Sequence, residues 1–207
     1  MRKSGIVRVV MAERTAAPGG VPSPSSDDEW LIVVDMQRAF AAADSVWHVE
    51  RFWEIAARIE RLLAAYGSRT ILTRYVPPAS LTGAWRDYFA AFPSMELPAD
   101  DPTWDIVIGV QAQAHIETRT TFAKWDANIA TIIGPDAPVT VCGVATECCV
   151  LATALAAIDD GRSVRVVEDA CAGATPQLHE HAMALLAAFA PLVCVVRCEE
   201  VIRQVVG

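Results

Sequence analysis

Short apolar runs separated by polar turns recur along the chain from residue 30 onward. Trp30-Leu-Ile-Val-Val-Asp35 is a continuous apolar run that ends in a carboxylate. An unbroken run of this length is typical of a central strand in a parallel sheet, where both faces are covered. The same pattern predicts further strands over 69–75, 116–122, 138–144, 163–168 and 192–197.

Helical periodicity occupies most of the segments between these strands. Over residues 49–66 apolar side chains recur at spacings of three and four, and Gly67 follows as a helix terminator. Further helices are expected over 126–133, 147–160, 176–189 and 199–206. Alternating β and α units with right-handed crossovers predict a doubly wound α/β fold. It would have three α/β/α layers and a mostly parallel sheet of about six strands.

The segment 79–105 interrupts this alternation. It is long, aromatic and punctuated by Pro, so we expect an active-site loop or a short helical excursion. Its aromatic side chains could line a substrate pocket or pack beneath the excursion. The candidates for the pocket are Phe40, Trp85, Tyr88, Phe89, Phe92 and Trp104. Arg74 and Arg86 are candidates for binding a substrate carboxylate.

The N-terminal part differs in composition from the rest. Residues 16–28 are rich in Pro, Gly, Ser and Asp and offer few apolar side chains to bury. We therefore interpret residues 1–28 as a flexible arm and residues 29–207 as one large α/β domain. Arg8 interrupts the only apolar stretch of the arm, so we expect no export signal.

Composition narrows the classes of partner. The chain has 207 residues, 53% of them hydrophobic, with a net charge of −8. This charge opposes nucleic acid and anionic membrane surfaces, and no apolar run approaches the roughly 20 residues of a membrane span. The six cysteines show no metal-binding spacing, which favours reduced thiols and a cytoplasmic location. The expected partner is a small-molecule substrate.

Three potentially reactive positions follow predicted strands. Asp35 ends the first strand, Lys124 follows the strand at 116–122, and Cys148 and Cys149 open the helix after 138–144. Taken singly, Asp35 could be a helix cap, Lys124 a surface residue and each cysteine a buried apolar side chain. Ligands of doubly wound sheets bind beyond the carboxyl ends of strands, so their joint placement favours an active site. Periodicity alone does not decide which cysteine faces it.

These residues resemble the isochorismatase-like cysteine hydrolases, a family that includes nicotinamidases and N-carbamoylsarcosine amidases. The resemblance spans roughly residues 30–197. It is carried by Asp-Met-Gln-Arg-Ala-Phe at 35–40, Lys124, and Gly-Val-Ala-Thr-Glu-Cys-Cys-Val at 143–150. It implies that Cys149 is the nucleophile, with Cys148 packed against the sheet. It also implies a cis peptide between Val144 and Ala145, with the amides of Ala145 and Cys149 forming an oxyanion hole.

The resemblance implies amide hydrolysis through a thioester. Asp35 would take the thiol proton, and Lys124 would stabilise the thiolate and hold Asp35 in place. A free thiol has a pKa near 8.5, and lowering it to about 6 would raise the thiolate fraction roughly 30-fold. We therefore expect the pKa of Cys149 to be lowered, partly by the positive end of its helix.

One departure concerns the metal of the nicotinamidases. After their second strand these carry Thr-Arg-Asp-Trp-His, where the Asp and His bind a metal, whereas this chain has Thr-Arg-Tyr-Val-Pro at 73–77. Tyr75 and Pro77 cannot supply such a ligand pair. His179 and His181 are expected to be solvated. The sequence predicts neither a metal nor another cofactor.

Two alternative functions stay open. The family also hydrolyses vinyl ethers without a thiol nucleophile, and a member could keep the fold for binding alone. The presence of Asp35, Lys124 and Cys149 favours the amidohydrolase. The apolar helix at 177–189 and the habit of the family suggest a homodimer or a larger homo-oligomer.

Overall fold

The computed structural model describes residues 28–109 and 114–206 of the chain. The arm expected over residues 1–28 lies outside the described residues except for Asp28. Six parallel strands form one sheet with the order β3-β2-β1-β4-β5-β6. This confirms the doubly wound fold and makes the sheet parallel throughout. The strands are β1 (Trp30–Val34), β2 (Thr70–Tyr75), β3 (His115–Arg119), β4 (Val139–Val144), β5 (Val164–Ala172) and β6 (Val193–Val196).

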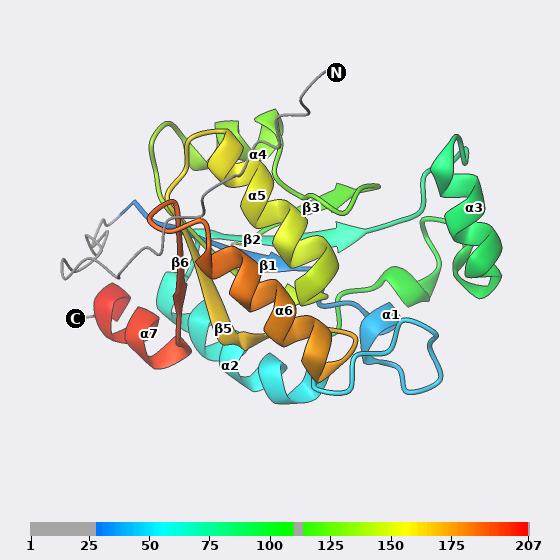
Figure 1. Ribbon diagram of the computed structural model, residues 1–207, viewed down its shortest axis with the longest axis horizontal. Helices are drawn as coiled ribbons and strands as arrows, with labels where there is room; N and C mark the ends of the chain where they lie inside the picture. Colours follow the sequence, from blue (N-terminus) through cyan, green and yellow to red (C-terminus); the bar gives the residue numbers. More distant parts are fainter. Residues whose placement is uncertain (1–27, 110–113, 207) are drawn as a thin grey trace, which may run out of the picture.

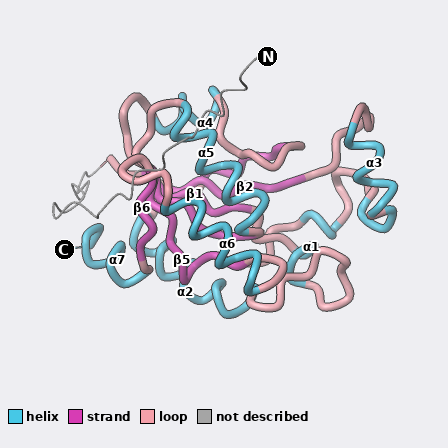
Figure 2. Tube along the Cα trace, viewed as in Figure 1, coloured by secondary structure: helices cyan, strands magenta, loops and turns pink. Residues whose placement is uncertain are grey.

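Helices cover both faces of the sheet. In Figure 1, α2 and α7 lie together on one face, and α4, α5 and α6 lie on the other. Figure 2 shows the strands as an inner layer between these helices. The helices are α1 (Arg38–Ala41), α2 (Phe52–Tyr66), α3 (Ala84–Ala91), α4 (Ala127–Ile133), α5 (Leu151–Asp159), α6 (Pro176–Ala187) and α7 (Cys198–Val206). Among the described residues, no helix has the length and apolar character needed to cross a bilayer.

The centre of the sheet brings two reactive segments together. β1 lies between β2 and β4, and Val34 at its end pairs with Gly143 of β4. Gly143 has φ +118°, and a Cβ there would lie 2.1 Å from the Val34 carbonyl oxygen. Only glycine permits this approach. The residues that follow β1 and β4 therefore emerge side by side at the point where the strand order reverses, which is where such sheets bind ligands.

The structure agrees with the short helical excursion expected over 79–105 and differs from the predicted elements at several boundaries, among them the end of β5, which runs four residues past the predicted 168 to Ala172. β3 ends at Arg119, three residues early, because the chain turns at Thr121, whose hydroxyl donates to the Ala123 carbonyl at 2.7 Å. The segment 79–105 contains α3 and the 3-10 turns Pro93–Met95 and Pro102–Trp104. The helix after β4 opens with a π-helical turn, Thr146–Val150, before α5 begins.

The amino ends of the strands hold a buried polar network. Glu29, directly before β1, forms an ion pair with Arg165 of β5, and the Arg165 Nε donates to Glu29 Oε1 at 2.8 Å. Thr140 of β4 donates to the same oxygen at 2.6 Å, and the Tyr66 hydroxyl of α2 donates to Thr140 at 3.0 Å. The network therefore ties three strands and a helix together at the end opposite the reactive segments.

Candidate active site

Asp35 lies directly after β1 and is fully buried. Its backbone has φ 51°, a conformation that non-glycine residues adopt uncommonly. The carboxylate Oδ2 lies 2.9 Å from Nζ of Lys124, which is also fully buried. Thr73 of β2 holds the other oxygen: its hydroxyl donates to Asp35 Oδ1 at 2.7 Å and accepts from the Asp35 N–H at 3.2 Å. The side chain is therefore fixed from two directions.

Lys124 is bound on several sides. Besides Asp35, its Nζ donates to the Thr121 carbonyl at 2.7 Å and lies 4.9 Å from the centroid of the Tyr75 ring. Its backbone N–H donates to Thr153 Oγ1 at 3.0 Å, and the Thr153 hydroxyl donates to the Cys149 carbonyl at 2.6 Å. The segment that carries the cation is thus tied to the helix that carries the thiol.

The turn after β4 presents Cys149 to this pair. The Val144–Ala145 peptide is cis, as the resemblance implies. The Ala145 carbonyl accepts hydrogen bonds from the N–H groups of Cys148 and Val150 at 3.1 and 3.2 Å. Cys149 is buried, and the negative charge of Asp35 acts on its thiol, whereas Cys148 is exposed. The expectation that Cys148 packs against the sheet is wrong, because the turn directs that side chain outward.

His179 of α6 supports the same turn. It is buried, and its Nδ1 lies 2.9 Å from Thr146 Oγ1. The expectation of a solvated residue is wrong for His179 but holds for His181, which is exposed. Burial, followed by the charge of Arg51, lowers the pKa of His179. The neutral ring therefore belongs to the scaffold of the turn.

The pKa of Cys149 moves in the opposite direction from the sequence expectation. Burial is the largest cause and raises the pKa well above its usual value, and the negative charge of Asp35 raises it further. The positive charge of Lys124 lowers it but does not reverse the effect. The sequence predicts a lowered pKa from the positive end of the helix and the charge of Lys124, but it does not show how deeply the thiol is buried. At rest the thiol is protonated and needs a base to become a nucleophile.

A pocket of about 310 Å³ opens onto Cys149. Phe40, Tyr88 and Phe92 line it, as expected from the sequence. Trp85, Phe89 and Trp104 do not: Phe89 and Trp104 are fully buried, and Trp85 packs against Tyr88 with ring centroids 5.5 Å apart. The rest of the lining is mostly aromatic and apolar and consists of Val46, Trp47, His48, Val49, Tyr75, Phe122, Ala145, Glu147, Cys148, Cys149 and Ala174.

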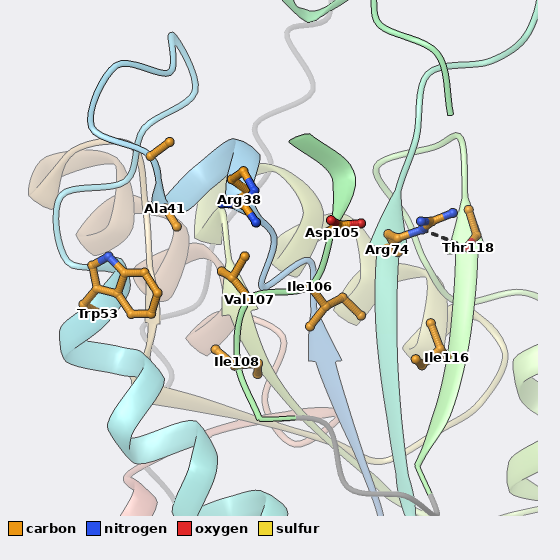
Figure 3. Close-up of a pocket in the computed structure, with 11 residues that line it drawn as sticks. Arg38, Ala41, Trp53, Arg74, Asp105, Ile106, Val107, Ile108, Ile116 and Thr118 are labelled. Carbon is orange, nitrogen blue, oxygen red and sulfur yellow. Dashed lines mark hydrogen bonds between the residues drawn. The ribbon is translucent and has the colours of Figure 1, made fainter. Parts of the chain in front are cut away.

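Arg74 and Arg86 lie away from this pocket. Arg74 lines a separate cavity of about 860 Å³ between α1, the start of α2 and the outer strands. Figure 3 shows it there beside Thr118, whose hydroxyl accepts from its Nε at 3.4 Å. Arg86 is exposed on α3 and lines neither cavity. Neither arginine therefore lines the pocket at Cys149, where a substrate carboxylate would have to be bound.

The donor set does not fit a metal of the nicotinamidase type. Tyr75 is buried, and burial raises the pKa of its hydroxyl well above the usual value, so the phenolate that could bind a cation is disfavoured. Pro77 offers no side-chain donor. Within residues 28–109 and 114–206, no group of three His, Cys, Asp or Glu side chains could hold a metal ion.

Two supporting residues escaped the sequence analysis. Gln37 is fully buried: its Nε2 donates to the carbonyls of Tyr75 and Trp104 at 2.9 and 2.7 Å, and its Oε1 accepts from the Tyr75 N–H at 2.8 Å. It joins the end of β2 to the excursion. Gln37 lies within the motif at 35–40 that carries the family resemblance, and this position could have marked it as a residue near the active site. Trp47 lies in an irregular loop, where no periodicity marks it as a wall of the pocket.

Comparisons with known proteins agree with this architecture. Residues 29–196 match the model of the isochorismatase domain family. The chain therefore belongs to the isochorismatase family. It is a hydrolase of that family, with the side chains of Asp35, Lys124 and Cys149 gathered at the carboxyl ends of its central strands. No match is found among curated protein sequences.

Solved structures share the fold at low sequence identity. A cysteine hydrolase from Pseudomonas syringae pv. phaseolicola 1448A has a TM-score of 0.75 and 22% identity, covering 86% of this chain and 92% of that one. An isochorismatase family protein from Desulfovibrio vulgaris has a TM-score of 0.74 and 20% identity, covering 87% and 99%. The pyrazinamidase of Pyrococcus horikoshii, solved with zinc, has a TM-score of 0.67 and 24% identity, covering 82% and 99%.

Proposed function

We propose that the protein is a metal-independent cysteine amidohydrolase that cleaves a C–N bond of a small amide or ureido compound. The observation that carries the proposal is the buried Asp35–Lys124 pair beside a Cys149 thiol of raised pKa. A protonated thiol next to a fixed carboxylate is arranged for proton transfer during attack. Such an arrangement does not require a stable thiolate at rest.

The reaction begins with attack of Cys149 Sγ on the amide carbonyl as its proton passes to Asp35. The new C–S bond places negative charge on the carbonyl oxygen, and the amides of Ala145 and Cys149 are the proposed donors to it. One such hydrogen bond is typically worth about 3 to 4 kcal/mol in the transition state. Collapse of this intermediate breaks the C–N bond, and the departing amine takes the proton from Asp35. The product is a thioester on Cys149.

Hydrolysis of the thioester uses the same groups in reverse. Asp35 takes a proton from water as the water oxygen attacks the carbonyl carbon, and the C–S bond then breaks. The sulfur recovers the proton from Asp35, which restores the starting state. Lys124 is the counter-ion throughout: its positive charge lies beside Asp35 before each step and favours the thiolate character of the sulfur during it.

Two alternatives carry less support. Vinyl-ether hydrolysis needs no thiol, yet here a thiol is buried against the proposed base. A non-catalytic binding protein has no need of a buried ion pair beside a thiol, because burying such a pair generally costs free energy.

Ammonia release from a panel of small amides and ureido compounds tests the proposal, with the two neighbouring cysteines as a matched pair. Cys149→Ala should lower turnover at least about 1,000-fold, because the covalent route is lost. Cys148→Ala should keep the thioester route and lose at most some substrate binding, because its thiol is exposed where it lines the pocket and is not the buried thiol beside Asp35. Wild-type acid-quench mass spectra should show acyl mass on the peptide containing Cys149. Equal turnover by wild type and Cys149→Ala would overturn the thioester mechanism.

A further inference from the structure

The pocket beside Cys149 gathers buried polar atoms that have no partner. Apart from the Asp35 oxygen that is paired with Lys124, six buried side-chain atoms in the described part of the chain lack a hydrogen-bond partner, and four of them belong to residues that line this pocket. They are Trp47 Nε1, His48 Nδ1, Tyr75 Oη and Glu147 Oε2. A buried polar atom without a partner is costly and calls for an explanation. Their concentration around one pocket makes this pocket the place where a ligand could supply the missing partners.

The charged side chain that lines the pocket is acidic and not basic. Glu147 is the only acidic residue in the lining, and the lining contains neither Lys nor Arg. Its Oε1 accepts the Ala174 N–H at 2.9 Å, and its Oε2 lies against Gly173, where a Cβ would come within 2.5 Å of that oxygen. No cationic side chain among the described residues forms a salt bridge with it. The carboxylate is therefore held in place without a counter-ion.

The remaining walls suit a cation as well. Trp47 lies at the centre of an aromatic group, with its ring centroid 5.9 Å from Phe40, 5.9 Å from Tyr75, 6.0 Å from Tyr88 and 6.1 Å from Phe92. Faces of aromatic rings attract cations, most strongly where water is excluded. The net charge of −8 adds a general attraction for cationic ligands.

We propose that the substrate is a small amide that carries an ammonium group, and that Glu147 selects it by charge among the aromatic walls. Tyr75, which is only 3% exposed, would donate its unpaired hydroxyl to an acceptor of the same ligand. This inference rests on the proposed function for the bond that is cleaved. It adds the charge of the substrate and names Glu147 as a specificity-determining residue. Anionic substrates, such as carboxylate-bearing ureido compounds, should be rejected.

Three probes of similar shape test the charge preference without any turnover: benzylammonium, benzyl alcohol and benzoate. A pocket of about 310 Å³ has room for each. Binding is measured by NMR titration of the Cys149→Ala protein. Benzylammonium should bind more tightly than benzyl alcohol by about tenfold, and benzoate most weakly. Equal affinity for benzylammonium and benzoate would overturn the proposal.

Glu147→Gln in the same background isolates the carboxylate, because a glutamine oxygen can still accept the Ala174 N–H. It should reduce the preference for benzylammonium over benzyl alcohol about tenfold. Glu50→Gln is the matched control, since Glu50 is exposed and outside the pocket lining and its loss removes the same charge. A preference left unchanged by Glu147→Gln, or reduced equally by Glu50→Gln, contradicts the assignment.

The outcomes separate this inference from the proposed function. Charge-selective binding that depends on Glu147, together with no hydrolysis of any amide, would overturn the amidohydrolase alone. Amide hydrolysis through Cys149 without charge preference would overturn the selection by Glu147 alone. Hydrolysis that favours 4-(aminomethyl)benzamide over 4-carbamoylbenzoate in wild type, and loses that preference in Glu147→Gln, is the result expected when both hold.

Discussion

Two buried ion pairs lie at opposite ends of the sheet and differ in what surrounds them. Glu29 and Arg165, at the amino ends, share a network in which Thr140 and Tyr66 supply further hydrogen bonds. Asp35 and Lys124, at the carboxyl ends, lie instead beside a titratable thiol and a pocket.

These surroundings indicate that Glu29–Arg165 is a structural ion pair and that Asp35–Lys124 is a reactive one. Both oxygens of Glu29 accept from Arg165, so its charge is fully engaged in joining β1 to β5. The negative charge of Asp35 raises the pKa of Cys149, so the protonation of the thiol depends on the carboxylate beside it. A buried charge is therefore informative about function only together with the groups that it faces.

Breaking the amino-end pair should have the largest effect on stability. Arg165→Met leaves Glu29 buried without its partner, and loss of one member of a buried pair typically costs about 3 to 5 kcal/mol. Urea unfolding measures the change in the free energy of unfolding. The rate of Cys149 alkylation in the folded protein should be unchanged. A destabilisation below about 1 kcal/mol would contradict the structural role.

A smaller effect is expected at His179, where the carboxyl end meets α6. Its folded-state pKa is lowered, chiefly by burial, so the neutral ring contributes stability that is present above the unfolded pKa of about 6.5 and lost as pH falls below it. Between pH 7.5 and 5.5 the wild-type protein should lose more stability than His179→Asn, whose amide can still meet Thr146. Thermal unfolding measures this difference. Equal losses of stability in the two proteins over this pH range would show that His179 is not the cause of the pH dependence.

No effect is expected from chelation. Tyr75 and Pro77 stand where the nicotinamidases that the sequence resembles carry metal ligands, and neither side chain is suited to bind a metal ion. Dialysis against EDTA or phenanthroline should leave amide turnover unchanged. Turnover that is lost on chelation and restored by zinc or iron would show that the reaction runs through a metal.

The sequence was most informative where a residue type and its place in a strand coincide. The run ending at Asp35 and the motif around Cys149 identified the sheet centre and its carboxyl edge, since strand ends follow from periodicity and turn residues. Trp47 could not be assigned to the pocket, because irregular loops have no period. Glu147 could not be assigned either, because the direction of its side chain depends on the π-helical turn that opens the helix. The protonation of Cys149 was mispredicted, since desolvation depends on packing from distant segments.

The central claim is that Cys149 is a protonated thiol controlled by opposed charges on Asp35 and Lys124. The pH profile of iodoacetamide labelling at Cys149, followed by peptide mass spectrometry, tests it most directly. Asp35→Asn removes a charge that raises the thiol pKa, so labelling should shift to lower pH while turnover falls by at least about 100-fold. Lys124→Met removes a charge that lowers the pKa, so labelling should shift to higher pH. Arg165→Met, at the other end of the sheet, should leave the profile unchanged. Profiles that stay together in all four proteins, or shift the opposite way in Asp35→Asn, would contradict the account.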